Sequence, residues 1–405
     1  MRDFLPADKA KREAVLSVIR ATYRAHGFDE IETPVMEDSD RLHAGLGGDN
    51  EKLAFGILKR GLDADDLAAA RDPLDLVDLG LRFDLTVPLA RFYATHHAEL
   101  PSVFRAIQIA PVWRAERPQK GRYRQFLQCD IDIIGEAGPL AEIELIRATA
   151  ATLDALGVRG WSIRLNDRRI LHRILDSWGV AAASRDSVLV SLDKEDKIGV
   201  AGVAAELNEL GLADPHRVTE TLEQLKSLPD DGWALGSPDW LDADAYADLL
   251  DIRVAMPDIP VVFSPNLVRG MGYYTGAIFE IAHPTSTSSL GGGGRYDGMI
   301  GRFLGTDVPA TGFSIGFERV LDLVDLQATE AADAVALLHD DTVPAARLAA
   351  LKSELIAQGL RVRLERKPRN LKPLFEQLAA SGYRRVATIG SDTAHAADLD
   401  FRELN

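Results

Sequence analysis

The segment from residue 107 to residue 135, IQIAPVWRAERPQKGRYRQFLQCDIDIIG, combines acidic, amide and basic side chains at regular spacing. Its pattern predicts two antiparallel strands around the loop RPQKGRY, with side chains alternating between two faces. On the second strand one face is polar or aromatic and carries Phe126, Gln128, Asp130 and Asp132. The other face is apolar and carries Leu127, Cys129, Ile131 and Ile133. The apolar face therefore belongs to the core, and the polar face is available to a ligand.

Basic residues flank and fill this predicted loop. On the first strand, Arg114 falls on the face that looks over the same surface as Gln128 and Asp132. The loop region adds Arg117, Lys120, Arg122 and Arg124. A guanidinium group forms paired hydrogen bonds with phosphate oxygens, so this chemistry suits a ligand that contains phosphate. A solvated hairpin with a charged tip is the alternative, because exposed charge is common on protein surfaces.

A second candidate site lies in SPNLVRGMGYYTGAIFEI, residues 264–281. Arg269 occupies a turn punctuated by glycine, and Tyr273 and Tyr274 follow directly. Such a turn lets a cation and two phenols approach a ligand closely. Packing of the two tyrosines in the core is the alternative explanation.

Two further segments and one carboxylate complete the candidates. The run GGGGRYDGMIG, residues 291–301, favours either a backbone that lies against a flat ligand or a flexible turn, and it matches neither a Walker nor a GxGxxG pattern. The segment GFSIGFERVLDLV, residues 312–324, places Arg319 near the start of an amphipathic helix. Asp84 in LRFDLT could pair with Asp132, either for acid–base work or for binding an ammonium or imidazolium group.

The elements around these residues follow from periodicity. Val15, Ile19 and Tyr23 recur at helical spacing within residues 8–26, and Gly27 follows as a C-terminal stop. The next segment, FDEIETPVME, alternates apolar and polar residues, and its Pro34 favours an edge strand or an interface. Residues of mainly β character are predicted over about 80–136 and again over 261–320.

Two other stretches have a different character. Residues 158–258 are mainly helical in pattern, and the part from Asp230 to Asp258 carries eight aspartates against the single Arg253, so we expect an inserted domain there. From residue 330 onward the pattern alternates strand and helix, which predicts a small three-layer α/β domain with a parallel sheet.

Composition limits the class of protein. The chain has 405 residues, enough for two to three domains, and a net charge of −16, which argues against a surface that is basic throughout. A single cysteine excludes an internal disulfide, and the nine histidines form no metal-binding pattern, so no metal site is predicted. The N-terminus lacks the apolar core of a signal peptide and no stretch could span a membrane. We therefore expect a cytoplasmic protein.

Five segments together resemble class II aminoacyl-tRNA synthetases, and specifically the histidyl-tRNA synthetase family. GFDEIETPVME resembles motif 1, VWRAERPQKGRYRQF resembles motif 2 and TGFSIGFERV resembles motif 3. LVRGMGYYTG and GGGGRYDG resemble the two histidine-specific signatures, with Gly272 where the family usually has Asp. QCDIDI and LRFDLT resemble the variant found in eukaryotes and some bacteria, which has Asp where others have Glu.

The resemblance implies an α+β fold, namely the class II antiparallel sheet flanked by helices. It implies a catalytic domain over 1–157 that continues over 259–327, a helical insertion domain over 158–258, and an anticodon-binding-like α/β domain over 330–405. The implied reaction joins histidine to ATP as histidyl-adenylate and then transfers histidine to the 3′ end of histidine tRNA. ATP would act as a substrate with Mg²⁺, without a tightly bound cofactor, and motif 1 would form a homodimer.

The same resemblance assigns residues to roles. Arg269 and Arg114 would be catalytic, because they would neutralise charge at the reacting phosphate. Histidine would be bound by Asp84, Leu85, Thr86, Arg114, Gln128, Asp132, Arg269, Tyr273 and Tyr274. ATP would be bound by Arg114, Glu116, Arg122, Phe126 and Arg319. The motif 2 loop would meet the acceptor end of tRNA through Gln119, Lys120 and Arg122. Separately from the resemblance, six basic residues lie within residues 361–372 against Glu365 alone, and this cluster, which includes Arg366 and Arg369, fits a contact with the anticodon stem.

Two other functions are compatible with these motifs. One is the catalytically silent regulatory subunit of ATP phosphoribosyltransferase, which typically lacks the motif 2 arginines, the signature arginine and the C-terminal domain. The presence of Arg114, Arg269 and Arg319 argues against it. The other is an adenylating paralogue that passes histidine to an acceptor other than tRNA.

Overall fold

The computed structural model describes residues 1–43, 53–117, 123–229, 231–233, 238–269, 273–324, 333–390 and 392–404. The chain divides into two compact units: residues 1–2 with 18–324, and residues 3–17 with 325–405. The predicted N-terminal helix is α1, Pro6–Ala25, and Gly27 follows it with a φ of 85°. That left-handed conformation suits glycine and ends the helix where the sequence predicts.

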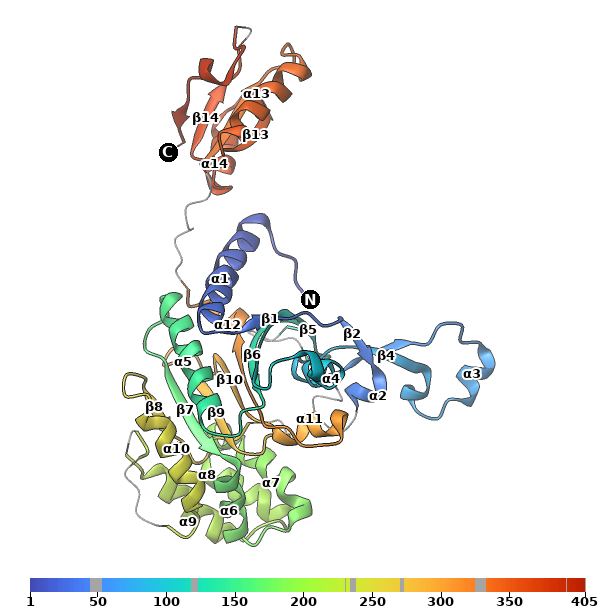
Figure 1. Cartoon of the computed structure of the whole chain (residues 1–405), viewed down its shortest axis with the longest axis vertical. Coiled ribbons are helices and arrows are strands. Elements are labelled where there is room, and N and C mark those ends of the chain that lie inside the picture. The colour runs from blue at the N-terminus through green and yellow to red at the C-terminus, as the bar shows by residue number, and fades with distance from the viewer. Residues whose placement is uncertain are drawn as a thin grey trace. The chain divides into compact units, whose positions relative to one another are not determined.

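An eight-stranded sheet forms the centre of the first unit (Figure 1). In spatial order its strands are β1 (Asp29–Glu30), β5 (Phe104–Trp113), β6 (Gln125–Ile134), β11 (Ala310–Gly316), β10 (Gly291–Arg295), β9 (Ala277–Ala282), β7 (Ser162–Asp167) and β8 (Val261–Phe263). The six strands from β5 to β7 pair antiparallel, while β1 and β8 pair in parallel at the two edges. The expected class of fold, an antiparallel sheet flanked by helices, is confirmed.

The predicted hairpin is the pair β5 and β6, and its two faces differ as expected. Cys129, Ile131 and Ile133 are fully buried on the apolar face. Helix α5 (Leu140–Ala155) covers this face, since its Glu142 accepts a hydrogen bond from Thr311 on β11, which lies opposite Ile133. Helices α4 (Thr86–His96) and α11 (Asp297–Leu304) pack together over one end of the other face.

Shorter elements complete this part of the chain. A three-stranded sheet contains β2 (Met36–Asp38), β4 (Val77–Leu81) and β3 (Phe55–Leu58). Helix α2 (Ser39–Leu42) and the 3-10 helix η2 (Pro73–Leu76) contact this sheet. Helix α3 (Ala64–Ala69) lies between β3 and η2 in the chain, and the 3-10 helix η3 (His97–Glu99) follows α4. Helix α12 (Phe317–Leu321) follows β11 directly.

The segment expected to be a helical insert begins differently from the prediction. Its first element is β7, which joins the large sheet beside β9, and the helices start only at Arg168. They are α6 (Arg168–Ser177), η4 (Ala182–Ser184), α7 (Arg185–Leu192), α8 (Glu195–Glu209), α9 (Pro215–Lys226) and α10 (Ala243–Val254). Residues 162–166 do alternate polar and apolar side chains, with Arg164 and Asn166 on the polar side of the sheet, but the strand has only six residues and leads directly into α6.

The second unit contains the predicted α/β arrangement. Strands β12 (Ala334–His339), β13 (Arg361–Arg366) and β14 (Arg385–Thr388) are parallel, and β15 (Arg402–Glu403) adds an antiparallel edge that the sequence did not indicate. Leu351 of α13 (Ala345–Ala357) packs on one face of β12, and Leu378 of α14 (Lys372–Ala380) packs on the other. The 3-10 helix η5 (Ala396–Asp398) packs beside α13.

Candidate active site

A cavity of about 270 Å³ opens over the polar face of the large sheet. The strand register explains why polar groups gather there. One cross-strand row joins Gln108 (β5), Asp130 (β6), Ser314 (β11) and Gly292 (β10), and residues paired in this way project from the same face. The next row places Asp132 opposite Gly312. Acidic side chains and glycines therefore alternate across the floor of the cavity.

The glycines are required because side chains from elsewhere lie directly on them. A Cβ at Gly292 would lie 2.6 Å from Cζ of Arg269, and a Cβ at Gly312 would overlap Oδ1 of Asp132. The glycine run 291–294 is a buried strand, β10, and the side chain of Arg269 lies against its Gly292. The flexible turn is excluded.

The structure brings together most of the residues singled out from the sequence. The cavity is lined by Asp84, Thr86, Arg114, Glu116, Phe126, Gln128, Asp132, Arg269, Tyr273, Tyr274 and Arg319. Leu85 is an exception, because its side chain is fully buried and does not reach the cavity. Its carbonyl oxygen instead accepts a hydrogen bond from Nε2 of Gln108 at 3.0 Å, which fixes the turn that carries Asp84 and Thr86.

Three carboxyl groups crowd one end of the cavity. Burial raises the pKa of Asp84 to about 6. Burial also raises the pKa of Asp132 to about 7, although a 2.6 Å hydrogen bond from the hydroxyl of Tyr296 opposes the shift. Burial and then the charge of Asp132 raise the pKa of Asp130 well above its ordinary value. Three buried acids with raised pKa values form a site that favours a cationic ligand.

Two acceptor atoms at this end lack a partner. Among the described residues, Oδ2 of Asp84 and Oε1 of Gln128 are buried without a hydrogen bond. Buried acceptors of this kind are costly unless a donor satisfies them. The other atoms are engaged: Oδ1 of Asp84 accepts from the backbone N–H of Val87 at 3.2 Å, and Nε2 of Gln128 donates to Oγ of Ser314 at 3.2 Å. The two unpartnered acceptors point to a ligand with several N–H donors, such as an ammonium group.

Three arginines line the cavity. Arg114 is held by a 2.9 Å hydrogen bond from its Nε to the carbonyl oxygen of Phe83, and its guanidinium lies 5.1 Å from the ring centre of Phe126. Arg269 donates from Nη1 to Oε2 of Glu280 at 3.0 Å. Arg319 donates from Nη1 to the carbonyl oxygen of Ser289. Guanidinium groups fixed in this way suit the binding of phosphate and carboxylate oxygens.

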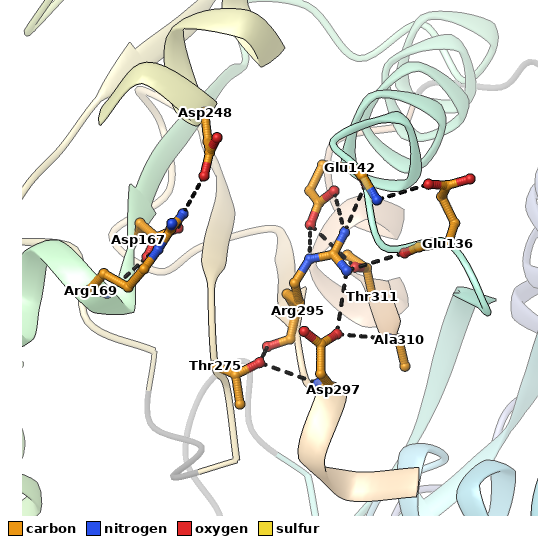
Figure 2. Close-up of polar contacts among 11 residues, drawn as sticks. Glu136, Glu142, Asp167, Arg169, Asp248, Thr275, Arg295, Asp297, Ala310 and Thr311 are labelled. Atoms are coloured by element: carbon orange, nitrogen blue, oxygen red, sulfur yellow. Dashed lines mark hydrogen bonds and ion pairs between the residues drawn. The ribbon is translucent and has the colours of Figure 1, made fainter. Parts of the chain in front are cut away.

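A buried ion pair joins Arg295 of β10 to Glu142 of α5 (Figure 2). Nε and Nη2 of Arg295 donate to the two carboxylate oxygens of Glu142 at 2.7 and 2.8 Å. The carbonyl oxygen of Arg295 accepts from the backbone N–H of Thr275, next to Tyr274, and Tyr296 follows Arg295 in the chain. The pair therefore fixes both segments that bring tyrosines to the cavity. In the same view, Arg169 joins Asp167 at the end of β7 to Asp248 of α10.

Comparison with known proteins identifies the family. The family model described as histidyl-tRNA synthetase matches residues 1–320. The chain is 59% identical to the histidine–tRNA ligase of Leifsonia xyli subsp. xyli over an alignment of 422 residues, which covers 100% of this chain and 97% of that protein. The chain belongs to the histidyl-tRNA synthetase family. A probable histidine–tRNA ligase of Tropheryma whipplei is 42% identical and covers 95% of this chain and 93% of its own length.

Solved structures share the fold. A histidyl-tRNA synthetase from Nostoc sp. PCC 7120 matches with a TM-score of 0.76 at 26% identity, covering 100% of this chain and 93% of that one. A Bacillus halodurans structure described as an ATP phosphoribosyltransferase regulatory subunit/histidyl-tRNA synthetase matches with a TM-score of 0.74 at 21% identity, covering 96% and 97%. The second likeness concerns the fold alone.

The structure does not place every residue singled out from the sequence at the cavity. Gln119, Lys120, Arg122 and Gly272 fall outside the described residues. Arg366 and Arg369 are exposed in the second unit, where Arg366 pairs with Asp341 at 2.8 Å. These two arginines are separate from the cavity residues along the chain and belong to the other compact unit.

The cavity also contains residues that received no role from the sequence. Asp130, Tyr296 and Tyr123 line it, as do Ser314 and Glu318. Asp130 lay on the predicted polar face and Tyr296 lay within GGGGRYDG, so both signals were available. Nothing in the local sequence marks Tyr123, Ser314 or Glu318.

Two kinds of feature are absent from the described ranges. In that part of the chain, no group of three or more His, Cys, Asp or Glu side chains is arranged to hold a metal ion. No helix there is long and apolar enough to cross a membrane.

Proposed function

We propose that the protein is a histidine–tRNA ligase that activates histidine with ATP and transfers it to the 3′ end of histidine tRNA. The observation that carries this proposal is the cavity itself: unpartnered buried acceptors of Asp84 and Gln128 at one end, with three guanidinium groups along the same cavity. A zwitterionic amino acid beside a nucleoside triphosphate has the complementary charges, because its ammonium group suits the acceptors and the phosphates suit the guanidinium groups. The identity of 59% with a relative named histidine–tRNA ligase supports the same activity.

Histidine would occupy the acidic end. Its ammonium group would satisfy Oδ2 of Asp84 and Oε1 of Gln128, with Thr86 beside them. Its imidazole would contact Asp132 and Tyr274, with Tyr273 packing against Tyr274 at a ring-centre distance of 4.8 Å. The hydrogen bond from Tyr296 holds the carboxyl of Asp132 in a single orientation.

ATP would occupy the arginine end. Arg114 and Arg319 would bind its phosphates, and Phe126 with Glu116 would bind the adenine. Mg²⁺ would accompany the phosphates, where it neutralises their charge. Carboxylate oxygens are ligands that Mg²⁺ prefers, and Glu318 at the cavity wall would supply them.

The chemical step needs positioning and charge neutralisation more than a protein nucleophile. A carboxylate oxygen of histidine attacks the α-phosphorus of ATP, and the bond from that phosphorus to the bridging oxygen breaks as pyrophosphate leaves. Negative charge builds up on the α-phosphate oxygens during the attack. Arg114 and Arg269, already fixed by Phe83 and Glu280, would stabilise that charge without reorganising.

Contacts with tRNA are proposed for two regions. Gln119, Lys120 and Arg122 would meet the acceptor end, and Arg122 would also bind ATP. Arg366 and Arg369 belong to a cluster of basic residues in the second unit, and positive charge there would attract the phosphates of an anticodon stem. We further propose a cytoplasmic homodimer that associates through motif 1.

The deciding experiment has two stages. Histidine-dependent exchange of pyrophosphate into ATP, in the presence of Mg²⁺, tests activation, and charging of histidine tRNA tests transfer. We expect both. Binding of histidine without exchange would instead favour the regulatory-subunit function that the Bacillus halodurans neighbour carries in its description. Exchange without charging would favour an adenylating paralogue.

A further inference from the structure

Glu280 lies between two cavities and is not among the residues expected to bind histidine, ATP or tRNA. It lies on β9 beside Gly292 of β10 and Arg164 of β7, in the same cross-strand row that crosses the cavity floor. Its Oε2 accepts from Nη1 of Arg269 at 3.0 Å, and its Oε1 lies 3.9 Å from Nη1 of Arg164. Its side chain is 18% exposed and lines a second, smaller cavity of about 70 Å³ rather than the first.

The backbone that carries Arg269 is held independently of its guanidinium. Nδ2 of the fully buried Asn166 donates to the carbonyl oxygens of Pro265 and Leu267 at 2.9 and 3.0 Å. Nδ2 of Asn266 donates to Oε2 of Glu195, the first residue of α8, at 2.8 Å. These contacts fix residues 265–267, which lead directly to Arg269, to the sheet and to the helical segment.

The end of the Arg269 side chain has to be fixed separately, because three methylene groups lie between its backbone and its guanidinium. Gly292 provides the space, since a Cβ there would lie 2.6 Å from Cζ of Arg269. Glu280 provides the direction, because it sits one strand further along the same row. A guanidinium has five N–H donors, so bonding Nη1 to Glu280 leaves Nε and Nη2 for a ligand.

We propose that Glu280 is a positioning residue that fixes the guanidinium of Arg269 over Gly292 for the activation step. Glu280 does not touch the reacting groups and acts through Arg269. The expected change in kcat rests on the proposed function. The expected position of the Arg269 guanidinium does not.

The first test compares two substitutions of equal size. Glu280→Gln keeps the shape and one acceptor oxygen but removes the charge that holds Arg269. We expect kcat for histidine-dependent pyrophosphate exchange to fall about tenfold to a hundredfold, with KM for ATP changed less than about twofold. The matched control is Glu144→Gln, which weakens a similar part-buried pair with Arg105 away from both cavities and should leave exchange unchanged. A wild-type kcat in Glu280→Gln would overturn the proposal.

A double-mutant cycle separates positioning from a general structural effect. If Glu280 acts only through Arg269, Glu280→Gln should cost less than about twofold in an Arg269→Ala background, measured as single-turnover adenylate formation with enzyme in excess. An equal loss in both backgrounds would mean that Glu280 supports the sheet and not Arg269.

A chemical readout keeps the proposal testable even if the wild-type chain performs no exchange, which would count against the proposed function alone. Phenylglyoxal modifies arginine side chains, and peptide mapping follows the rate at Arg269 in the full chain. We expect labelling of Arg269 to be at least about threefold faster in Glu280→Gln than in the wild type, because the guanidinium loses the carboxylate that holds it. Equal rates in the two proteins would overturn the proposal, and Glu144→Gln should match the wild type.

Discussion

The acidic and the basic side chains of the large cavity use charge in opposite ways. Asp84, Asp130 and Asp132 are buried, and burial raises the pKa of each. Arg114 and Arg269 each have a fixed partner within the protein, and arginine stays charged at any physiological pH. The charge of the three acids therefore depends on pH, whereas the charge of the arginines is permanent and already oriented. We expect the acids to select the ligand and the arginines to stabilise charge that develops during the reaction.

The largest effect is expected from removing a permanent charge. Arg269→Ala should lower kcat for histidine-dependent exchange by about a thousandfold, because the developing charge on the α-phosphate loses a fixed donor. Thermal unfolding should be close to that of the wild type, since the loop backbone is still held through Asn166. Substantial exchange by a folded Arg269→Ala protein would show that the activation step does not depend on the charge of Arg269.

A smaller effect is expected at the acidic end when one hydrogen bond is removed. Tyr296→Phe should raise KM for histidine about tenfold, because the carboxyl of Asp132 loses the hydroxyl that orients it. Tyr246→Phe is the matched control, as it removes a hydroxyl bonded to the carbonyl oxygen of Trp233 outside the cavity. Equal KM values for the two variants would argue that Asp132 needs no orientation.

Histidine binding should also depend on pH. With the pKa of Asp84 raised to about 6 and that of Asp132 raised to about 7, both carboxyls take up protons as the pH falls through these values. An ammonium ligand needs the charged form of Asp84, so we expect the contribution of this carboxyl to raise histidine affinity about fourfold between pH 5.5 and pH 7.5. Calorimetric titration in buffers of different ionisation heat should detect proton release on binding. An Asp84→Asn variant should lose most of the pH dependence, and an unchanged slope would contradict the assignment.

The smallest effect concerns stability without ligand. Because the pKa of Asp84 in the fold lies above its unfolded value, its charge opposes folding above pH 6, and this cost fades as the pH falls toward 4. Asp84→Asn should therefore raise the unfolding temperature of the empty protein by about 2 °C at pH 8, but not near pH 4. A lower unfolding temperature at pH 8 would show that the carboxylate is well compensated.

The sequence was most informative where one periodic pattern was enough. Alternation along residues 125–134 placed Asp130 and Asp132 on one face, and the structure confirms that both line the cavity. Motif resemblance brought in Asp84 and Arg269, which are distant in sequence from that strand. The resemblance does not show whether a residue acts through its side chain or its backbone. Leu85 is expected to bind histidine, but its side chain is buried outside the cavity and its carbonyl oxygen accepts a hydrogen bond from Gln108.

Pairings across strands could not be predicted. Glu280 looks like any acidic residue on a strand, and its role depends on the register that sets β9 beside both β10 and β7. The participation of β7 in the sheet was missed for the same reason, since its neighbour β9 lies more than a hundred residues away. Register of this kind is determined by the packing of both faces at once.

Strand β10 has a consequence for the order of the cavity floor. Its four consecutive glycines offer no side chains to a hydrophobic cluster, and an unfolded stretch of glycine has the largest backbone entropy to lose. Along the glycines only the backbone groups of β9 and β11 hold the register, and Arg295 at the end of the strand adds the ion pair with Glu142. The order of the cavity floor therefore depends on both neighbouring strands and on one arginine that lies outside the cavity.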